Sequence, residues 1–316
     1  MPAEAWRSGL FSYTRNHMNT KTTSLPTSGK TAHFTREDRL AEARSILERG
    51  LEDVEQDPEA LARYLRFRAH FRQYSPQNTL LIQAQRPTAR YVKGFAAWKD
   101  VGRHVRKGEK GIMILAPVLR RPTEEEARKQ NLDPQKDHIV AAFRVAYVWD
   151  ITQTEVIPGY EETALRYESP IPKLRGDDFA HLYVNLTRVA ERLGFQVIRY
   201  DDRLEEGYCD FRRRMIGVRV GSDNDATLTL AHELAHAVAH EKTEGLSYVA
   251  AELQAEGAAF VLCYALGLDA RMSSLQYLKA YEERGTAIAE QLDAIDRIAF
   301  WLLRSVQDLL DENHCK

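Results

Sequence analysis

The sequence predicts an α+β protein of two domains, and three features support this fold class. The chain has 316 residues, which is more than one typical small domain. Helical patterns near the N-terminus are followed by glycine-rich, strand-like segments, the order expected of an α+β domain. The second half again predicts a helix and short strands, followed by long helices. With 44% hydrophobic and 28% charged residues, the composition is that of a soluble globular protein.

Residues 1–34 are predicted to form a flexible tail because they are rich in Ser, Thr, Asn and Lys. They contain no continuous apolar segment typical of a secretory signal, and no window of the chain reaches the ~18 apolar residues of a membrane span. The three cysteines, Cys209, Cys263 and Cys315, form no CxxC pair, which suits a reducing compartment. We therefore expect a cytoplasmic protein without a membrane partner.

The first domain is predicted at 35–160. Helix starts are expected at Thr35 with Asp38, at Asp57 with Pro58, and at Ser75 with Pro76, because these pairs are typical N-terminal capping signals. Strands are expected at 111–118 and 141–151, where apolar residues form a run or alternate. The polar segment at 119–138 shows no periodicity and is predicted to be a solvated loop.

The second domain is predicted at 179–316, after a linker at 161–178 that contains prolines and a glycine. Its expected elements are a helix at 179–193, a strand at 195–200, a strand or hairpin at 207–221, helices at 225–241 and 247–266, and a terminal helix at 273–310. Asp225 is the expected N-cap of the first long helix, and Gly267 is expected to end the second.

The helix at 225–241 contains the segment LTLAHELAHAVAH. His232 and His236 share one face because residues four apart are neighbours on a helix, so both can bind one ion. Glu233 then lies beside the ion, where it can activate a bound water as a general base, as in the HExxH motif. Zinc is the expected ion, with another divalent metal such as Mn²⁺ as the alternative. The competing interpretation is a buried helix with incidental histidines.

A catalytic zinc site needs a third protein ligand. Lys242 stands where the metzincin pattern requires histidine and excludes that pattern. Glu252 and Glu256 lie one turn apart on the next apolar helix, and buried carboxylates are costly unless they are paired or bind a metal. We predict Glu252 as the ligand and Glu256 as the acceptor for a histidine N–H. The swapped assignment and a solvated Glu256 remain alternatives, and His240 is expected to support the site without binding the ion.

This arrangement predicts hydrolysis of a peptide bond by an activated water, so a protein substrate is one expected partner. The segment MIGVRV at 215–220 is expected to be an edge strand that holds an extended peptide by strand addition.

A strongly basic segment lies in the first domain. Residues 60–121 contain 14 Lys and Arg against two acidic residues, a charge of +12, so the rest of the chain, with 30 basic and 44 acidic residues, carries −14. Its cations are interleaved with aromatic residues, a pattern that suits single-stranded nucleic acid. The predicted nucleic-acid contacts are Arg63, Arg66, Arg72, Asn78, Arg90, Lys93, Trp98, Lys99, Arg103, Arg106, Lys107 and Lys110. The alternative is that the rings fill the core, Trp98 above all, and the cations form a solvated face.

Several separated motifs resemble the ArdC antirestriction family. YSPQNTLLIQAQ, GFAAWKDVGRHVRKGEKGIMILAPV and VAYVWDITQTE are similar to its N-terminal single-stranded-DNA-binding domain. TLAHELAHAVAH and AAELQAEGAAFVLCYALGLD are similar to its C-terminal zincin domain, which is related to the ImmA/IrrE metallopeptidases. The resemblance implies a plasmid- or phage-borne protein that binds single-stranded DNA and protects incoming DNA from host restriction. It also implies that His232, Glu233 and His236 form the metal motif, with Glu252 as the downstream acid.

Three functions follow from these observations. The first is a metal-containing, single-stranded-DNA-binding antirestriction protein. The second is a regulatory metallopeptidase that cleaves a repressor, with the basic domain placing it on DNA. The third is a non-catalytic DNA-binding protein whose zinc is structural.

Overall fold

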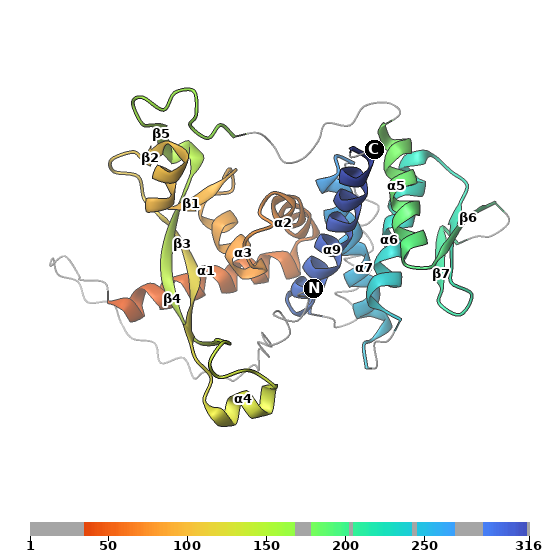
Figure 1. Ribbon diagram of the computed structural model, residues 1–316, viewed down its shortest axis with the longest axis horizontal. Coiled ribbons are helices and arrows are strands. Elements are labelled where there is room, and N and C mark those ends of the chain that lie inside the picture. Colours follow the sequence, from red (N-terminus) through yellow and green to blue (C-terminus); the bar gives the residue numbers. More distant parts are fainter. Residues whose placement is uncertain (1–34, 168–177, 202–204, 242–244, 269–286, 315–316) are drawn as a thin grey trace. The chain divides into compact units, whose positions relative to one another are not determined.

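The computed structural model describes residues 35–167, 178–201, 205–241, 245–268 and 287–314 (Figure 1). The predicted tail, most of the predicted linker and the start of the predicted terminal helix lie outside these residues. The described residues divide into two units, 35–41 with 115–145, and 42–114 with the described part of 146–314. The predicted boundaries at 160 and 178 stay a prediction.

The first unit contains the C-terminal part of β3 (Ile112–Arg120), the N-terminal part of β4 (Ile139–Asp150) and the helix between these strands, α4 (Glu124–Gln130). The prediction of a loop throughout 119–138 was therefore wrong. The Thr123 hydroxyl accepts from the Glu126 N–H at 3.3 Å, and the Glu126 carboxylate accepts from the Thr123 N–H at 2.8 Å. This capping box satisfies N–H groups at the start of a helix that has only one buried residue, Ala127. The S/T-x-x-E spacing that signals it was present in the sequence.

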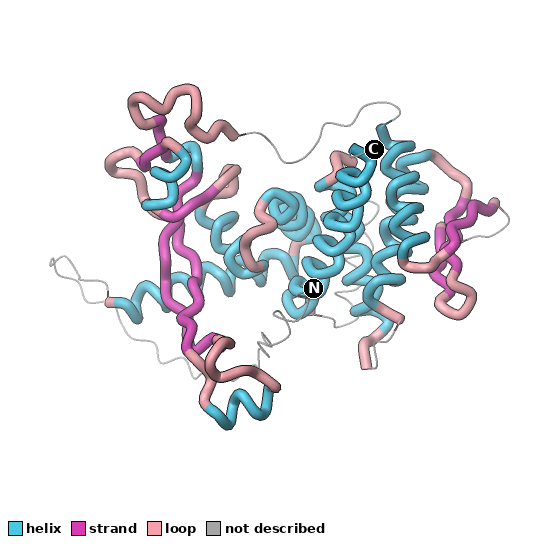
Figure 2. The backbone as a smooth tube through the Cα atoms, in the orientation of Figure 1, coloured by secondary structure: helices cyan, strands magenta, loops and turns pink. Residues whose placement is uncertain are grey.

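Most of the second unit is helical (Figure 2). Its helices are α1 (Arg36–Gln56, whose first turn belongs to the first unit), α2 (Pro58–His70), α3 (Pro76–Gln85), α5 (Asp178–Arg192), α6 (Asp223–Ala239), α7 (Tyr248–Ala265) and α9 (Ile288–His314). The predicted starts at Asp57–Pro58 and Ser75–Pro76 are confirmed, since both side chains accept from helix N–H groups. The predicted N-cap Asp225 was wrong: Ser222 caps α6, and its hydroxyl accepts from the Asp225 N–H.

One hydrophobic core joins these helices. Helix α7 packs against α2, α6 and α9, and α5 packs against α6. The core therefore contains side chains from both predicted domains, including Leu61 and Leu65 of α2 beside Leu253 and Phe260 of α7. Burial of this apolar surface is the main force that holds α6 and α7 together.

The described strands form three small sheets. β1 (Val92–Gly94), β4 (Ile139–Asp150) and β3 (Ile112–Arg120) pair in the order β1-β4-β3, and β2 (Arg103–Val105) pairs with β5 (Thr154–Val156). The short 3-10 helices Ala96–Val101 and Ile151–Gln153 precede β2 and β5. The α+β class is confirmed by this mixture of helices and sheets.

The third sheet corrects a prediction about the peptide-binding strand. β8 (Met215–Arg219) lies between β6 (Gln196–Tyr200), with which it is parallel, and β7 (Gly207–Asp210), with which it is antiparallel. A central strand has both backbone edges paired, so MIGVRV cannot hold a peptide by strand addition. Among the described strands of this sheet, β6 and β7 form the edges.

Within the described ranges, no helix combines the length and the low polarity that crossing a bilayer demands.

Candidate metal centre

Helices α6 and α7 supply the residues of the candidate centre. α6 carries His232, Glu233 and His236 after its Ser222 cap, and α7 carries Glu252 and Glu256 after its Ser247 cap. The two helices pack against each other through buried apolar side chains. The histidine face of α6 therefore lies opposite the carboxylates of α7.

Three side chains converge on one point. His232 Nε2 lies 3.1 Å from His236 Nε2, and each nitrogen lies 3.4 Å from an oxygen of Glu252. Two ligands of a tetrahedral ion with bonds of about 2.0–2.1 Å lie about 3.3 Å apart. The two 3.4 Å distances end at different oxygens of Glu252, Oε2 for His232 and Oε1 for His236. One ligand atom from each of the three residues lies within 4.8 Å of the other two, a spacing at which one metal ion can be shared.

The second nitrogen of each histidine also has a partner. His232 Nδ1 lies 2.8 Å from Glu256 Oε2, and His236 Nδ1 lies 2.8 Å from His240 Nδ1. His240 Nε2 in turn lies 3.2 Å from Gln254 Oε1, and the Gln254 amide donates to Gln291 Oε1 at 2.7 Å. These contacts at Nδ1, on the side away from the proposed ion, fix the orientation of both imidazole rings.

Gln254 and Gln291 are site residues that the sequence reasoning missed. Gln254 had a weak signal, because it is a polar residue in an apolar helix and is buried. Gln291 belongs to α9 and contacts the site only through tertiary packing, which no local pattern reveals.

Glu233 is nearly buried, with 7% of its surface exposed. Burial raises the pKa of its carboxyl above the usual value, while His232 and His236 act in the opposite direction. Gly207 of β7 makes room for it: a Cβ there would lie 2.9 Å from Glu233 Oε1 and 2.4 Å from the Thr229 methyl. Gly207 is a further residue that the sequence reasoning missed.

The electrostatics of the histidine pair favour a cation. Burial lowers the pKa of His232, but its hydrogen bonds to Glu252 and Glu256 outweigh burial and raise the pKa to about 10. Burial would raise the pKa of Glu252, but hydrogen bonds with His232 and His236 lower it well below the usual range. A positive charge between the rings and the carboxylate is therefore stabilised.

The predicted nucleic-acid contacts have varied surroundings. Lys99, Lys107 and Lys110 are exposed and form no ion pair with any residue that the structure describes. Asn78 is half-buried near the start of α3, where its N–H donates to Ser75. Contacts inside the chain engage the other charged candidates: Arg63 with Asp57, Arg66 with Phe260, Arg72 with Ala69, Arg90 with Tyr167, Lys93 with Tyr91, Arg103 with Thr154 and Leu165, and Arg106 with Thr152, Thr154 and Glu109.

Trp98 requires a correction. Its side chain is 0% exposed, lies in a cluster with Val105 and Ile151, and donates its N–H to the Trp149 carbonyl. A fully buried ring cannot stack on a base, so Trp98 is a core residue.

Comparisons with known proteins agree with this architecture. Residues 41–149 match the family model described as the N-terminal domain of anti-restriction factor ArdC. The chain is 23% identical over 298 residues to the uncharacterized protein pXO2-81 of Bacillus anthracis, covering 84% of this chain and 50% of that protein. It thus spans about half the length of this curated relative.

Two solved structures are similar in fold, both of the antirestriction protein ArdC from the R388 plasmid. The metal-free structure has a TM-score of 0.53 at 18% identity and covers 84% of this chain and 98% of that one. The Mn(II)-bound structure has a TM-score of 0.52 at 19% identity and covers 86% and 97%. Residues 41–149 are therefore similar to the N-terminal domain of ArdC, and the chain shares the fold of the R388 protein.

Proposed function

We propose that this protein is a metal-containing antirestriction protein that binds single-stranded DNA and protects incoming DNA from restriction. One observation carries the metal part of the proposal: two imidazole nitrogens and a carboxylate converge at 3.1–3.4 Å beside the buried Glu233. The ArdC-type domain at 41–149 supports the antirestriction part. The R388 relative is itself called an antirestriction protein, and one of its structures holds Mn(II).

The residues of the site fit a divalent metal. His232, His236 and Glu252 would be its ligands. Zinc suits the donor set better than Mn²⁺, because two of the three donors are imidazoles, whereas Mn²⁺ favours carboxylate and water. A divalent ion bound there would lower the pKa of a coordinated water and polarise a carbonyl.

The chain's own residues set the proton positions around this site. If His236 binds through Nε2, its proton is on Nδ1 and is donated to His240 Nδ1. The His240 proton must then be on Nε2, from which it is donated to Gln254 Oε1. Likewise, His232 donates its Nδ1 proton to Glu256. His240, Gln254 and Glu256 thus select the tautomers that leave both Nε2 atoms free to bind.

The second candidate function is a regulatory metallopeptidase. Glu233 favours it, because burial raises the pKa of a carboxyl that lies where a general base is needed. The strand that would hold a peptide is β7, whose Gly207 lies against Glu233.

Glu233→Ala separates the two functions because it removes the base and keeps all three proposed ligands. We expect the variant to contain the wild-type amount of metal by elemental analysis, to bind single-stranded DNA with unchanged affinity, and to protect a transferred plasmid against a restricting host. Loss of protection with metal and DNA binding intact would instead support the peptidase. A wild-type protein that holds no divalent metal, or that binds no single-stranded DNA, would contradict the proposal.

A further inference from the structure

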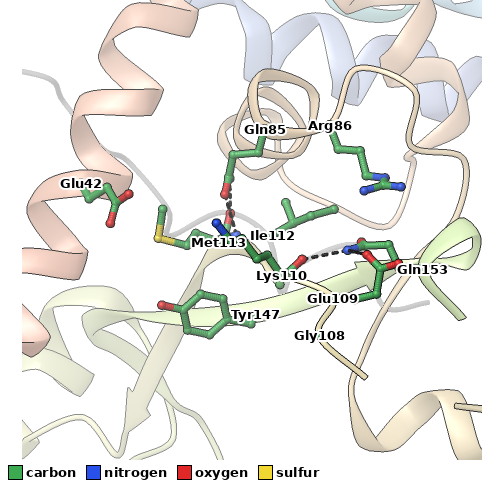
Figure 3. A pocket seen from close by; sticks show the side chains of 11 residues that line it. Glu42, Gln85, Arg86, Gly108, Glu109, Lys110, Ile112, Met113, Tyr147 and Gln153 are labelled. Carbon is green, nitrogen blue, oxygen red and sulfur yellow. Dashed lines mark hydrogen bonds between the residues drawn. The ribbon is translucent and has the colours of Figure 1, made fainter. Parts of the chain in front are cut away.

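A cavity of about 750 Å³ lies in the second unit, apart from the histidine site. The segment Gly108–Met113, a loop that runs into the start of β3, forms one wall, and Arg86 at the end of α3, Tyr147 of β4 and Glu42 of α1 surround the cavity (Figure 3). Its volume lies in the range of about 300–1,000 Å³ that is usual for small-ligand sites.

Two cations line this cavity. Lys110 is exposed and unpaired among the described residues, and its carbonyl accepts from the Gln153 amide at 2.8 Å, which holds the loop in place. The Arg86 guanidinium donates to Thr152 at 2.9 Å, while its Nε has no hydrogen-bond partner in the part of the chain that the structure describes. That nitrogen is buried and pairs with Asp150 Oδ2 at 4.0 Å. An anion in the cavity can therefore reach only the terminal nitrogens of Arg86, whose side chain is 32% exposed.

The two acidic residues that line the cavity, Glu109 and Glu42, differ in their contacts. Glu109 is hydrogen-bonded by Gln153 and Arg106, and these contacts lower the pKa of its carboxyl. Glu42 is exposed on the opposite wall, and no ion pair engages it among the described residues. Glu109 is thus an ionised carboxylate engaged by Arg106 and Gln153 beside the two cations, whereas Glu42 is a separate carboxylate that can accept from an amino group.

Aromatic rings continue from this cavity along the sheet. Tyr147 lines it, Trp149 lies 6.5 Å from Tyr147 between ring centroids, and Phe95 lies 5.4 Å from Trp149 and is 53% exposed. The loop reaches these rings because residue 111 is glycine: a Cβ there would lie 2.8 Å from Trp149 and 2.9 Å from the Tyr147 Cβ.

We propose that this cavity holds one nucleotide of an unpaired DNA strand, with its phosphate at Arg86 and Lys110 and its base against Tyr147. Phosphate needs cationic donors and an unpaired base needs a ring, and both are present within one cavity. Glu42 would accept from the exocyclic amino group of cytosine or adenine. The inference rests on the proposed function and adds to it the place where the strand binds.

The test measures fluorescence anisotropy of a labelled single-stranded oligonucleotide with the full-length protein. Lys110→Ala and Tyr147→Ala should each weaken binding about tenfold, the loss expected for one phosphate contact or one stacked base, whereas Tyr147→Phe should bind as wild type. Lys136→Ala, which removes an exposed lysine of the first unit, is the matched control and should change little.

A second measurement locates the strand directly. Oligonucleotides with a photoreactive pyrimidine should cross-link to the peptide that contains Tyr147, and Tyr147→Ala should abolish that cross-link. If the wild-type protein binds no single-stranded DNA, the proposed function fails. A different result would overturn only the nucleotide subsite: the wild-type protein binds single-stranded DNA, Lys110→Ala keeps full affinity, and the cross-links lie outside the Tyr147 peptide.

Discussion

At the scale of single residues, the histidine site depends on groups behind the proposed ligands. Glu256 and His240 each lie 2.8 Å from the Nδ1 atom of a proposed ligand histidine. Loss of such a partner typically weakens metal affinity 10–100-fold, because ring orientation and tautomer are no longer selected. We expect Glu256→Ala and His240→Ala to show about this loss in a competition titration with a coloured zinc chelator.

Glu252→Ala provides the comparison for that titration, because it removes a proposed ligand and should weaken binding more than either support variant. Equal affinity for Glu252→Ala and wild type, together with a large loss for Glu256→Ala, would establish the swapped ligand assignment.

At the scale of secondary-structure elements, one buried ion pair joins α2 to α9. Arg68 Nε and the Arg68 terminal nitrogen both lie 2.7 Å from Asp296 Oδ2, with side-chain exposures of 3% and 10%, and the guanidinium stacks over Phe300 at 4.6 Å. Burial raises the pKa of Asp296, and Arg68 opposes this shift. Removing one partner leaves a buried charge, which costs about 3–5 kcal/mol.

We therefore expect Asp296→Ala to lower the free energy of unfolding by about 3–5 kcal/mol in urea denaturation. The double variant Arg68→Met with Asp296→Leu should recover most of this loss, because no charge is then buried. If Asp296→Ala is as stable as wild type, the pair does not join the two helices in solution.

At the scale of the whole molecule, most cationic side chains of the basic segment at 60–121 already contact other groups of the chain. All ten arginine side chains between residues 60 and 121 contact other groups of the chain. The ammonium groups of Lys99, Lys107 and Lys110 form no ion pair or hydrogen bond with any described residue. The net charge of the segment therefore overstates the number of phosphates that it can neutralise.

For single strands, the slope of log K against log salt is about −0.7 per phosphate contact. With Arg86 and the three lysines as contacts, we expect a slope near −3, and Lys107→Ala should make it shallower by about 0.7. Ten contacts, one for each Lys or Arg among the residues predicted from the sequence, would instead give about −7. The measurement is a series of binding isotherms from low to physiological salt.

Local patterns predicted a large part of this fold. The Asp57–Pro58 and Ser75–Pro76 starts and the long apolar helices were readable because caps and 3.6-residue periodicity act within a few residues. α4 was missed because its apolar face is a single alanine, so periodicity was absent and only its capping box remained. The central position of β8 was missed because strand order depends on two partners, one of them in a parallel pairing, that no local pattern specifies.

The spacing His232-x-x-x-His236 depends on helix geometry alone, so the sequence was sufficient to place both imidazoles on one face. Which carboxylate approaches their Nε2 atoms depends on how α7 packs against α6, and the packing brings Glu252 to the pair and Glu256 behind it. Tertiary packing also decides how much of a basic segment can bind a ligand. The composition gives the number of charges, but only the folded chain determines which arginines donate to its own carbonyls and which face the solvent.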